Sequence, residues 1–224
     1  MKIFIPKDTT AVALDADDVA QALSRAQHAL EAEICRNGSR GAFWLEPLVE
    51  VELAAGRYAF GPIGVEDVPG LLECLPDRLE DHPKYLGLTE DIPWLANQER
   101  VTFARAGLGD PVCIHTYTKL SGFSGLEKSA TLTSQEIVTQ VLESGLRGRG
   151  GAAFPTGIKW QTVLDTPSDQ KYIVCNADEG DSGTFADRLL MEADPFQLIE
   201  GMVIAGAAVG ATLGYIYLRS EYPL

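Results

Sequence analysis

A glycine-rich, cationic segment is the first feature of this sequence that could carry chemistry. Residues 145–160 read GLRGRGGAAFPTGIKW, with five glycines in the first thirteen positions and three cations, Arg147, Arg149 and Lys159. Glycine lets successive backbone N–H groups approach an anion closely, and arginine and lysine neutralise its charge. The segment therefore predicts a phosphate-binding loop. The alternative is a glycine-rich surface loop whose arginines are simply solvated.

The spacing of this segment differs from that of two familiar phosphate loops. A Walker loop has lysine directly after its glycine, whereas Ile158 stands before Lys159 here. The pattern from Gly148 to Ala153 formally matches a dinucleotide fingerprint. However, a helix rather than a strand is predicted before it, and Pro155 interrupts the residues after it, so the match alone is weak evidence.

An acid-rich loop follows a predicted buried strand at Lys171–Cys175. Residues 176–185 read NADEGDSGTF, and open α/β sheets place their ligand sites at this end of a strand. The carboxylates could bind a hard cation, but an EF-hand alignment puts Asp181 where the obligatory glycine belongs, which disfavours calcium. Carboxylates and the asparagine amide also bind ribose hydroxyls and ring N–H groups. Together the two loops predict a nucleotide or flavin cofactor, and the alternative for the second is an acidic surface turn.

No side chains form a recognisable nucleophile and base. The three histidines are scattered and predict ordinary surface roles: His28, His82 and His115. The four cysteines lack metal-ligand spacing and predict small buried hydrophobes: Cys35, Cys74, Cys113 and Cys175. Because no catalytic side chain stands out and no metal site is expected, a redox cofactor that carries its own reactivity is the economical hypothesis.

Composition limits the class of protein. The chain has 224 residues, a formal net charge of −14 and 46% hydrophobic residues, which allows one or two globular domains and excludes a disordered acidic tail. The acidic balance also excludes nucleic-acid binding over the whole surface. Residues Met1–Pro6 begin like a strand rather than a signal peptide, so a cytoplasmic protein without disulfides is expected.

One uncharged stretch, Gly201–Leu218, is about long enough for a membrane span. Four glycines interrupt it, and its end is rich in β-favouring residues. We therefore expect a buried helix over Pro195–Leu213 that stops at Gly214, followed by a strand, and no membrane segment.

The remaining elements predict an α/β protein with two domains. The first, residues 1–78, should contain a strand, a helix, three strands and a short helix, at Lys2–Ile5, Asp17–Glu33, Phe43–Leu45, Val49–Leu53, Arg57–Phe60 and Val65–Cys74. Prolines and glycines then mark an extended connector over 79–121, whose apolar residues should pack against something. The second domain, residues 122–224, has a helix that opens at Thr133 and runs to Ser144.

The two loops resemble the flavin-binding, NADH-oxidising subunits of respiratory complex I, NAD-linked hydrogenases and NAD-dependent formate dehydrogenases. The resemblance covers Gly145–Trp160, Tyr172–Arg188 and Gly201–Tyr222. It implies FMN and NAD as cofactors in an α/β fold of the complex I flavin-subunit type. Residues implied at the FMN are Gly148, Arg149, Gly150, Gly151, Lys159, Asn176, Asp178, Glu179 and Gly180. Residues implied at the NAD are Phe154, Lys159 and Asp181.

Two departures from this family's pattern bear on the site. The family usually has glycine where Ala153 stands, and a methyl group is tolerated there only if the backbone is not left-handed. The family often has Glu-Pro where Asp181 and Ser182 stand, so the shorter carboxylate should alter NAD affinity or release.

The first domain resembles the cysteine-poor, thioredoxin-like extension of the flavin subunit in soluble formate dehydrogenases, through the segment RNGSRGAFWLEPLV at residues 36–49. Cys35 and Cys74 alone cannot supply four iron–sulfur ligands, so this domain should be a docking scaffold. The family's [4Fe–4S] ligands and the second half of its flavin fold are not in this sequence, and we expect a partial chain.

These resemblances predict the diaphorase subunit of a cytoplasmic NAD-dependent formate dehydrogenase, which moves hydride between NAD(H) and FMN and electrons to iron–sulfur centres. Implied partners are a small thioredoxin-like [2Fe–2S] subunit and a formate-oxidising molybdenum subunit. The alternatives are the flavin subunit of a hydrogenase or of complex I, and, from another class, a non-catalytic docking or assembly fragment. The electron direction stays open.

Overall fold

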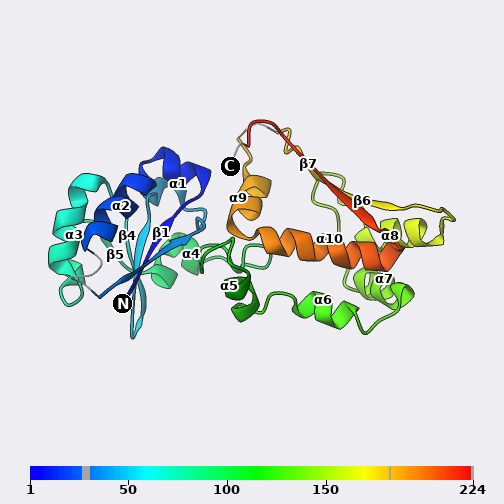
Figure 1. The fold of residues 1–224 in the computed structure, drawn as a ribbon, viewed down its shortest axis with the longest axis horizontal. Helices are drawn as coiled ribbons and strands as arrows, with labels where there is room; N and C mark the ends of the chain where they lie inside the picture. Colours follow the sequence, from blue (N-terminus) through cyan, green and yellow to red (C-terminus); the bar gives the residue numbers. More distant parts are fainter. Residues whose placement is uncertain (27–30, 182, 223–224) are drawn as a thin grey trace. The chain divides into compact units, whose positions relative to one another are not determined.

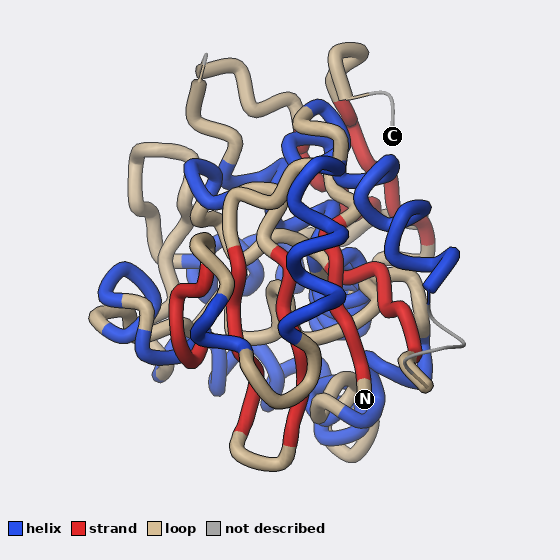
Figure 2. Tube along the Cα trace, turned by 90° about the vertical axis from the view of Figure 1, so that its left-hand side faces the viewer, coloured by secondary structure: helices blue, strands red, loops and turns tan. Residues whose placement is uncertain are grey.

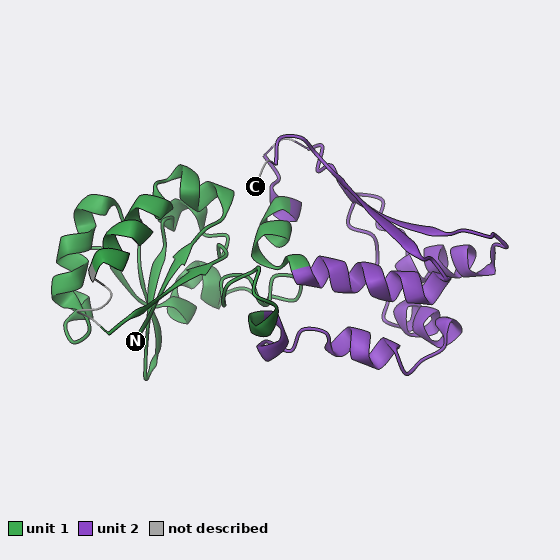
Figure 3. Ribbon diagram, in the orientation of Figure 1, with its two compact units in different colours: residues 1–116, 188–195, 224 green, residues 117–187, 196–223 purple. Residues whose placement is uncertain are grey.

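The computed structural model describes residues 1–26, 31–181 and 183–222, which form two compact units (Figures 1 and 3). Unit 1 comprises residues 1–116 and 188–195, and unit 2 comprises residues 117–187 and 196–223. The chain therefore enters unit 2, returns to unit 1 for eight residues, and goes back to unit 2.

Unit 1 is built on a five-stranded mixed sheet with the strand order β2-β1-β3-β4-β5. Its strands are β1 (Lys2–Pro6), β2 (Glu33–Asn37), β3 (Val49–Leu53), β4 (Gly56–Phe60) and β5 (Tyr85–Leu88). Strands β1 and β2 are parallel, whereas β3, β4 and β5 are each antiparallel to the neighbour before them. Figure 2 looks onto this unit and shows the strands side by side. A mixed sheet with helices is what the predicted α/β class requires, and the thioredoxin-like character of this unit stays a prediction.

Helices α1 (Thr9–Ala13) and α2 (Ala16–Ala26) connect β1 to β2, and α3 (Val68–Cys74) follows β4. Alternating residues of β1 and β3 supply the buried face of the sheet, and the apolar stripe of α2 covers it. The fully buried members include Ile3, Ile5, Val19, Leu23, Val51 and Leu71. Periodicity along each element thus determines which face enters the core.

Two predicted elements of this unit are wrong. The helix predicted over Asp17–Glu33 ends at Ala26, and β2 begins at Glu33, where Glu33 pairs with Lys2 and Cys35 with Phe4. Residues 27–30, including His28, lie outside the described residues. The strand predicted at Phe43–Leu45 is a single 3-10 turn, and among the described residues no strand pairs with it.

The proline- and glycine-rich stretch after α3 belongs to unit 1 up to residue 116. It supplies the edge strand β5, which the sequence did not predict, and the short helix α4 (Pro93–Ala96). Ile92 and Leu95 pack with Leu48 and Ala59 in a second small core. The expected packing of the apolar residues in this stretch is therefore present for Leu95. His82 is also buried, against Phe60, rather than on the surface.

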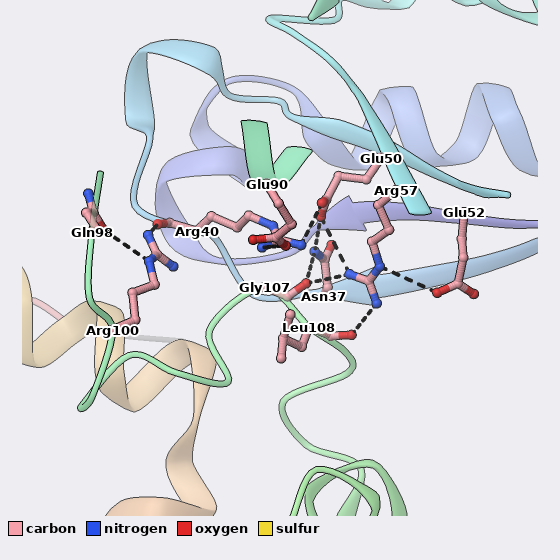
Figure 4. Close-up of polar contacts among 10 residues, drawn as sticks. All are labelled: Asn37, Arg40, Glu50, Glu52, Arg57, Glu90, Gln98, Arg100, Gly107 and Leu108. Carbon is pink, nitrogen blue, oxygen red and sulfur yellow. Dashed lines mark hydrogen bonds and ion pairs between the residues drawn. The ribbon is translucent and has the colours of Figure 1, made fainter. Parts of the chain in front are cut away.

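A buried cluster of charged side chains fastens this stretch to the sheet (Figure 4). The guanidinium of Arg40 lies 2.8 Å from Glu50 Oε1, and these side chains are 5% and 1% exposed. Asn37 and Arg57 each donate a hydrogen bond to the carbonyl oxygen of Gly107, at 2.9 and 3.0 Å. Gly107 has φ +85° and lies against the side chain of Arg40, where a Cβ would collide. The connector backbone is thus held by side chains that emerge from β2 and β4.

Unit 2 packs helices against a two-stranded parallel sheet. Its elements are α5 (Ile114–Lys119, shared with unit 1), α6 (Ser124–Ser129), α7 (Ser134–Glu143), α8 (Thr156–Asp165), β6 (Tyr172–Ala177), α10 (Pro195–Val209) and β7 (Leu213–Leu218). The predicted start of α7 is confirmed, since Thr133 and Glu136 form a capping box. Buried residues of α7 and α10, including Val138 and Val209, form the core.

Buried Glu200 of α10 organises the first helices of unit 2. Its carboxylate accepts hydrogen bonds from the hydroxyl of Tyr117 and from the backbone N–H groups of Phe123 and Leu126, the last two at 2.8 and 2.9 Å. A carboxylate inside an apolar helix is stabilised when several donors surround it.

The predicted helix and strand at the end of the chain are present, with a shifted boundary. Helix α10 ends at Val209 and not at Leu213, because Gly210 takes a left-handed conformation with φ +75°, the usual helix terminator. Gly214 instead lies inside β7, where its missing side chain leaves room for Met202 of α10. None of the helices in the described part of the chain is long and apolar enough to cross a membrane.

Candidate cofactor site

The glycine-rich segment forms a closed loop between α7 and α8. Gly148 N donates to the carbonyl of Phe154, and Thr156 N donates to that of Leu146, both at 2.9 Å. These bonds flank an antiparallel bridge between Arg147 and Pro155. Residues 149–154 therefore project as an exposed turn whose two stems are fixed, which suits a loop that must present backbone N–H groups.

Lys159 lies on the first turns of α8 and points back to this loop. A Cβ built on Gly148 would lie 3.5 Å from Lys159 Nζ, an ordinary van der Waals contact, so the ammonium group lies directly beside this part of the loop. Cβ positions on Gly150 and Gly151 would meet no atom within 4 Å, so the backbone there faces open space. Arg149 is exposed in the same turn, whereas Arg147 donates to the carbonyl of Ala153 within the loop. An anion beside the glycines would meet Lys159 and Arg149.

Gly157 fixes the helix that carries this lysine. A Cβ on Gly157 would come within 2.5 Å of Leu142 Cα, because α8 crosses α7 with backbones in close approach. The sequence places Gly157 among the glycines of the loop, but its role is to let the two helices pack.

Ala153 has a left-handed backbone, with φ +51°. The condition under which a methyl group would be tolerated at this position is therefore not met. An L-residue in this conformation costs about 1–2 kcal/mol, which glycine avoids.

We expect Ala153→Gly to tighten the closed loop modestly. The relief of strain exceeds the extra flexibility of glycine in the unfolded chain, about 0.5–1 kcal/mol, so local opening should become about two- to fivefold rarer. Amide exchange at Gly148, whose N–H closes the loop, measures this directly. Ala152→Gly is the matched control because Ala152 is not left-handed, and that change should speed exchange. Equal effects of the two substitutions would contradict the strain argument.

The acid-rich loop begins where β6 ends. Asn176 Oδ1 accepts a hydrogen bond from Asp178 N at 3.2 Å, and Asp178 Oδ2 lies against Gly180. Glu179, with φ +43°, accepts at Oε1 from Asp187 N and at Oε2 from the hydroxyl of Tyr222, both at 2.8 Å. The carboxylate of Glu179 thus joins the loop to Asp187, just after it, and to the segment after β7 that carries Tyr222.

Arg219 and Tyr222, which sequence reasoning did not single out, complete this arrangement. Arg219 donates to the carbonyl oxygen of Glu179 at 2.7 Å. Both residues follow β7, and because β7 runs parallel to β6, the segments after the two strands meet at one edge of the sheet. That topological rule, applied to the predicted strands, is the signal that could have found them.

Glu179 affects the pKa values of two neighbouring side chains. Burial, and then the charge of Glu179, raise the pKa of Asp187 above its usual range. Burial and the hydrogen bond to Glu179 likewise raise the pKa of Tyr222. Both shifts indicate a carboxylate region that would interact favourably with donor groups of a ligand.

The structure groups the expected site residues into two sets. One set holds Lys159 against Gly148 in the glycine loop, with Phe154, 49% exposed, at its edge. The other joins Asn176, Asp178 and Gly180 around Glu179, with Asp181 exposed. The two sets of contacts share no residue. Ser182 lies outside the described residues.

An apolar groove of about 350 Å³ lies between α10 and the two strands, and none of the expected site residues lines it. Its lining includes Ile173, Ile199, Met202 and Ile216. Within the described ranges, no group of three or more His, Cys, Asp or Glu side chains is placed to hold a metal ion. The cysteines are half-buried rather than fully buried.

The residues present fit an anionic, phosphate-bearing group. Open backbone at Gly150 and Gly151, with Arg149 and Lys159 beside them, offers both N–H donors and positive charge in a chain of net charge −14. Carboxylate and amide acceptors in the second loop fit hydroxyl and ring N–H donors.

A family of known proteins matches the part of the chain that contains both loops. Residues 141–224 match a family model described as the Nuo51 FMN-binding domain. The NADP-reducing hydrogenase subunit HndC of Solidesulfovibrio fructosivorans is 53% identical over 127 residues, which are 57% of this chain and 26% of that protein. A subunit of the NADH-quinone oxidoreductase of Rhizobium meliloti is 47% identical over 125 residues, 55% of this chain and 30% of that protein.

A third relative is the NAD-reducing hydrogenase HoxS subunit alpha of Cupriavidus necator, 47% identical over 97 residues, which are 43% of this chain and 16% of that protein. The chain thus spans less than a third of the length of each of these three relatives.

Proposed function

We propose that unit 2 binds FMN and is part of an NAD(H)-dependent oxidoreductase, because residues 141–224 match the Nuo51 FMN-binding domain model. The observation that carries the proposal is the closed glycine loop, in which Lys159 rests against Gly148 beside open backbone. Bound FMN supplies hydride exchange with nicotinamide and one-electron exchange with iron–sulfur centres. The chain's own residues bind and orient the two ligands.

In this proposal the glycine loop takes the phosphate side of FMN. The backbone N–H groups of Gly150 and Gly151 donate to the phosphate, and Arg149 adds positive charge. The N–H of Gly148 closes the loop onto Phe154, so Gly148 contributes by shaping the phosphate side of the site. Lys159 stands at the junction of the flavin and the nicotinamide nucleotide, with its ammonium group beside Gly148.

The carboxylate loop takes the sugar and ring side of FMN, through Asn176, Asp178, Glu179 and Gly180. Because Glu179 already accepts from Asp187 and Tyr222, its part includes holding the loop in shape. Exposed Phe154 stacks on the incoming nicotinamide nucleotide, and exposed Asp181 faces the dinucleotide.

The sequence of unit 1 supports a more specific proposal for the subunits that exchange electrons with the flavin. Its likeness to the extension of soluble formate dehydrogenases supports a cytoplasmic complex with a small [2Fe–2S] subunit and a formate-oxidising molybdenum subunit. The names of two relatives, HndC and the HoxS alpha subunit, favour a hydrogenase instead. Co-purification from the native host followed by assay with formate or with hydrogen separates these two candidates.

We expect Lys159→Ala to weaken FMN binding about tenfold, since a charge-assisted contact is worth about 1.5–3 kcal/mol before solvent screening. Titration of the full chain with FMN, followed by flavin fluorescence, measures the dissociation constant. Lys128→Ala, which removes an exposed lysine from α6, is the matched control and should leave binding unchanged. Riboflavin, which lacks the phosphate, reports whether the loss is specific to that group.

Two outcomes would contradict the proposal. If the folded wild-type chain shows no flavin binding, the FMN function of these residues is wrong and a docking or assembly role is favoured. If FMN binds but Lys159→Ala and Glu179→Gln both leave binding and NADH:ferricyanide turnover unchanged, the site is elsewhere.

A further inference from the structure

Helix α9 (Ala186–Ala193) directly follows the acid-rich loop, and most of it belongs to unit 1. Residues up to Asp187 are part of unit 2, whereas Arg188–Pro195 are part of unit 1. The peptide bond between Asp187 and Arg188 therefore joins the loop to a segment that the thioredoxin-like unit holds.

The first contact that holds α9 is a two-point hydrogen bond from Glu192 to the start of α1. Thr9 N donates to Glu192 Oε2 at 2.9 Å, and the hydroxyl of Thr9 donates to Glu192 Oε1. Arg188, one turn earlier on α9, donates to the hydroxyl of Thr10 at 2.6 Å. Two successive threonines thus bind two side chains on one face of α9.

Two further contacts fix the end of the helix. A Cβ on Gly38 would come within 2.8 Å of Ala193 Cα, so the backbone after β2 is in close approach to α9. The carboxylate of Asp194, 4% exposed, lies 2.8 Å from Arg105 Nε. These contacts specify the position of α9 on unit 1 far more tightly than a loose linker would require.

At the other end of α9, the backbone N–H of Asp187 donates to Glu179 Oε1. An N–H group in the first turn of a helix has no partner within the helix, so it is available to bind the loop. This hydrogen bond ties the carboxylate of Glu179 to the first turn of α9.

We propose that Glu192 is a positioning residue for the carboxylate loop: by holding α9 on Thr9, it fixes the N–H of Asp187 that orders Glu179. The effect runs along the backbone of α9 from Glu192 to Asp187. The consequence for FMN rests on the proposed function, whereas the consequence for loop order does not.

Amide hydrogen exchange of the full chain tests the proposal without any cofactor. Glu192→Ala removes both acceptors for Thr9, and we expect exchange at Asp187 and across residues 177–187 to become about tenfold faster. Exchange in β1 and β3 should not change. Glu73→Ala, an exposed glutamate of α3, is the matched control and should alter neither region.

Conservative variants distinguish positioning from general destabilisation. Glu192→Gln keeps one acceptor oxygen and should restore most of the protection, and Thr9→Val, which removes only the hydroxyl, should give a smaller acceleration of the same amides. Thr9→Val also serves if Glu192→Ala does not fold. Faster exchange confined to residues 188–193, with 177–187 unchanged, would overturn the proposal.

The FMN dissociation constant gives the second measurement. We expect it to rise about threefold to tenfold in Glu192→Ala, in parallel with the faster exchange. If wild type binds no FMN but the exchange result holds, the proposed function fails and the positioning role stands. If FMN binds wild type and Glu192→Ala equally while loop exchange is unchanged, the positioning role fails and the proposed function stands.

Discussion

Replacing Arg40 by methionine is expected to lower the free energy of unfolding of unit 1 by about 3–5 kcal/mol, the usual result of leaving one charge of a buried pair without its partner. Glu50 is 1% exposed, and Arg40 Nη2 lies 2.8 Å from its Oε1. Methionine fills a similar apolar volume, so the loss comes from a buried carboxylate that keeps only the more distant Arg57 as its cation, rather than from a cavity.

The other groups near Glu50 cannot replace Arg40. Asn37 Nδ2 lies 3.4 Å from Glu50 Oε2 and is already shared with the carbonyl of Gly107. Arg57 Nη1 lies 3.7 Å from the same oxygen and donates to the same carbonyl. In the variant, Oε1 of Glu50, on the side opposite to Asn37 and Arg57, would face the apolar methionine side chain. Arg40 also contacts Glu90 of the connector at 3.1 Å, so the connector loses an attachment as well.

Urea unfolding monitored by tryptophan fluorescence measures the effect, in a Trp160→Phe background so that Trp44 and Trp94 report on unit 1. Arg25→Met, at an exposed arginine of α2, is the matched control and should change stability by less than about 0.5 kcal/mol. The double variant Arg40→Met/Glu50→Gln removes both charges and should recover most of the loss. A loss below about 1 kcal/mol in Arg40→Met alone would contradict the buried-charge account.

Local sequence patterns predicted those strands and helices in which apolar residues recur at the spacing of the element. The strands β1, β3, β4 and β6 and the helix α7 follow from periodicity and from a capping box at Thr133. Strands β2 and β5 do not, because each is defined by pairing with a distant strand. The helical pattern of α2 ran on into β2, and β5 lies in a proline- and glycine-rich stretch with little pattern of its own.

The candidate site likewise has parts that local sequence patterns predict and parts that depend on contacts between distant residues. Composition located both loops, since glycines with cations and carboxylates after a strand are local signals. The contacts of Glu179 with Arg219 and Tyr222 join residues 40 and 43 positions apart, and they depend on the pairing of β6 with β7. The backbone of Ala153 posed a question that only three-dimensional structure could answer, since sequence states which residue is present and not its φ.

The ion pair of Arg40 with Glu50 was beyond sequence reasoning for a related reason. A glutamate in a strand that alternates polar and apolar residues predicts a solvated face, yet Glu50 is buried because the connector covers that face of the sheet. A second buried carboxylate, Glu46, differs from Glu50 because the two described groups that donate to it are neutral.

Glu46 is expected to make unit 1 less stable as the pH rises. It is 3% exposed, and its donors are neutral: the hydroxyl of Ser39 at 2.6 Å and the backbone N–H of Leu48 at 2.9 Å. Burial raises the pKa of Glu46 to about 7, against the two hydrogen bonds, and the nearby carboxylates of Asp8 and Glu50 raise it further. Burial also raises the pKa of Asp8, which adds to the same trend.

The direction of the effect follows from proton linkage. Between its ordinary pKa of 4.5 and about 7, Glu46 holds its proton in the folded state and loses it in the unfolded state. Stability is therefore complete below pH 4.5 and is lost as the pH rises through about 7. At about 1.4 kcal/mol for each pKa unit, the loss by pH 8.5 is on the order of 3 kcal/mol.

Glu46→Gln should remove this loss. The amide can accept from Leu48 N and donate to the Ser39 hydroxyl, so both hydrogen bonds survive without a buried charge. Urea unfolding of the variant should show about 2–3 kcal/mol more stability than wild type at pH 8.5 and little difference at pH 5. Glu99→Gln, at an exposed glutamate of the same unit, should match wild type at both values. A constant difference between Glu46→Gln and wild type across this range would contradict the raised pKa. It would mean that Glu46 is ionised in the folded protein throughout, and that the buried site stabilises the ionised carboxylate.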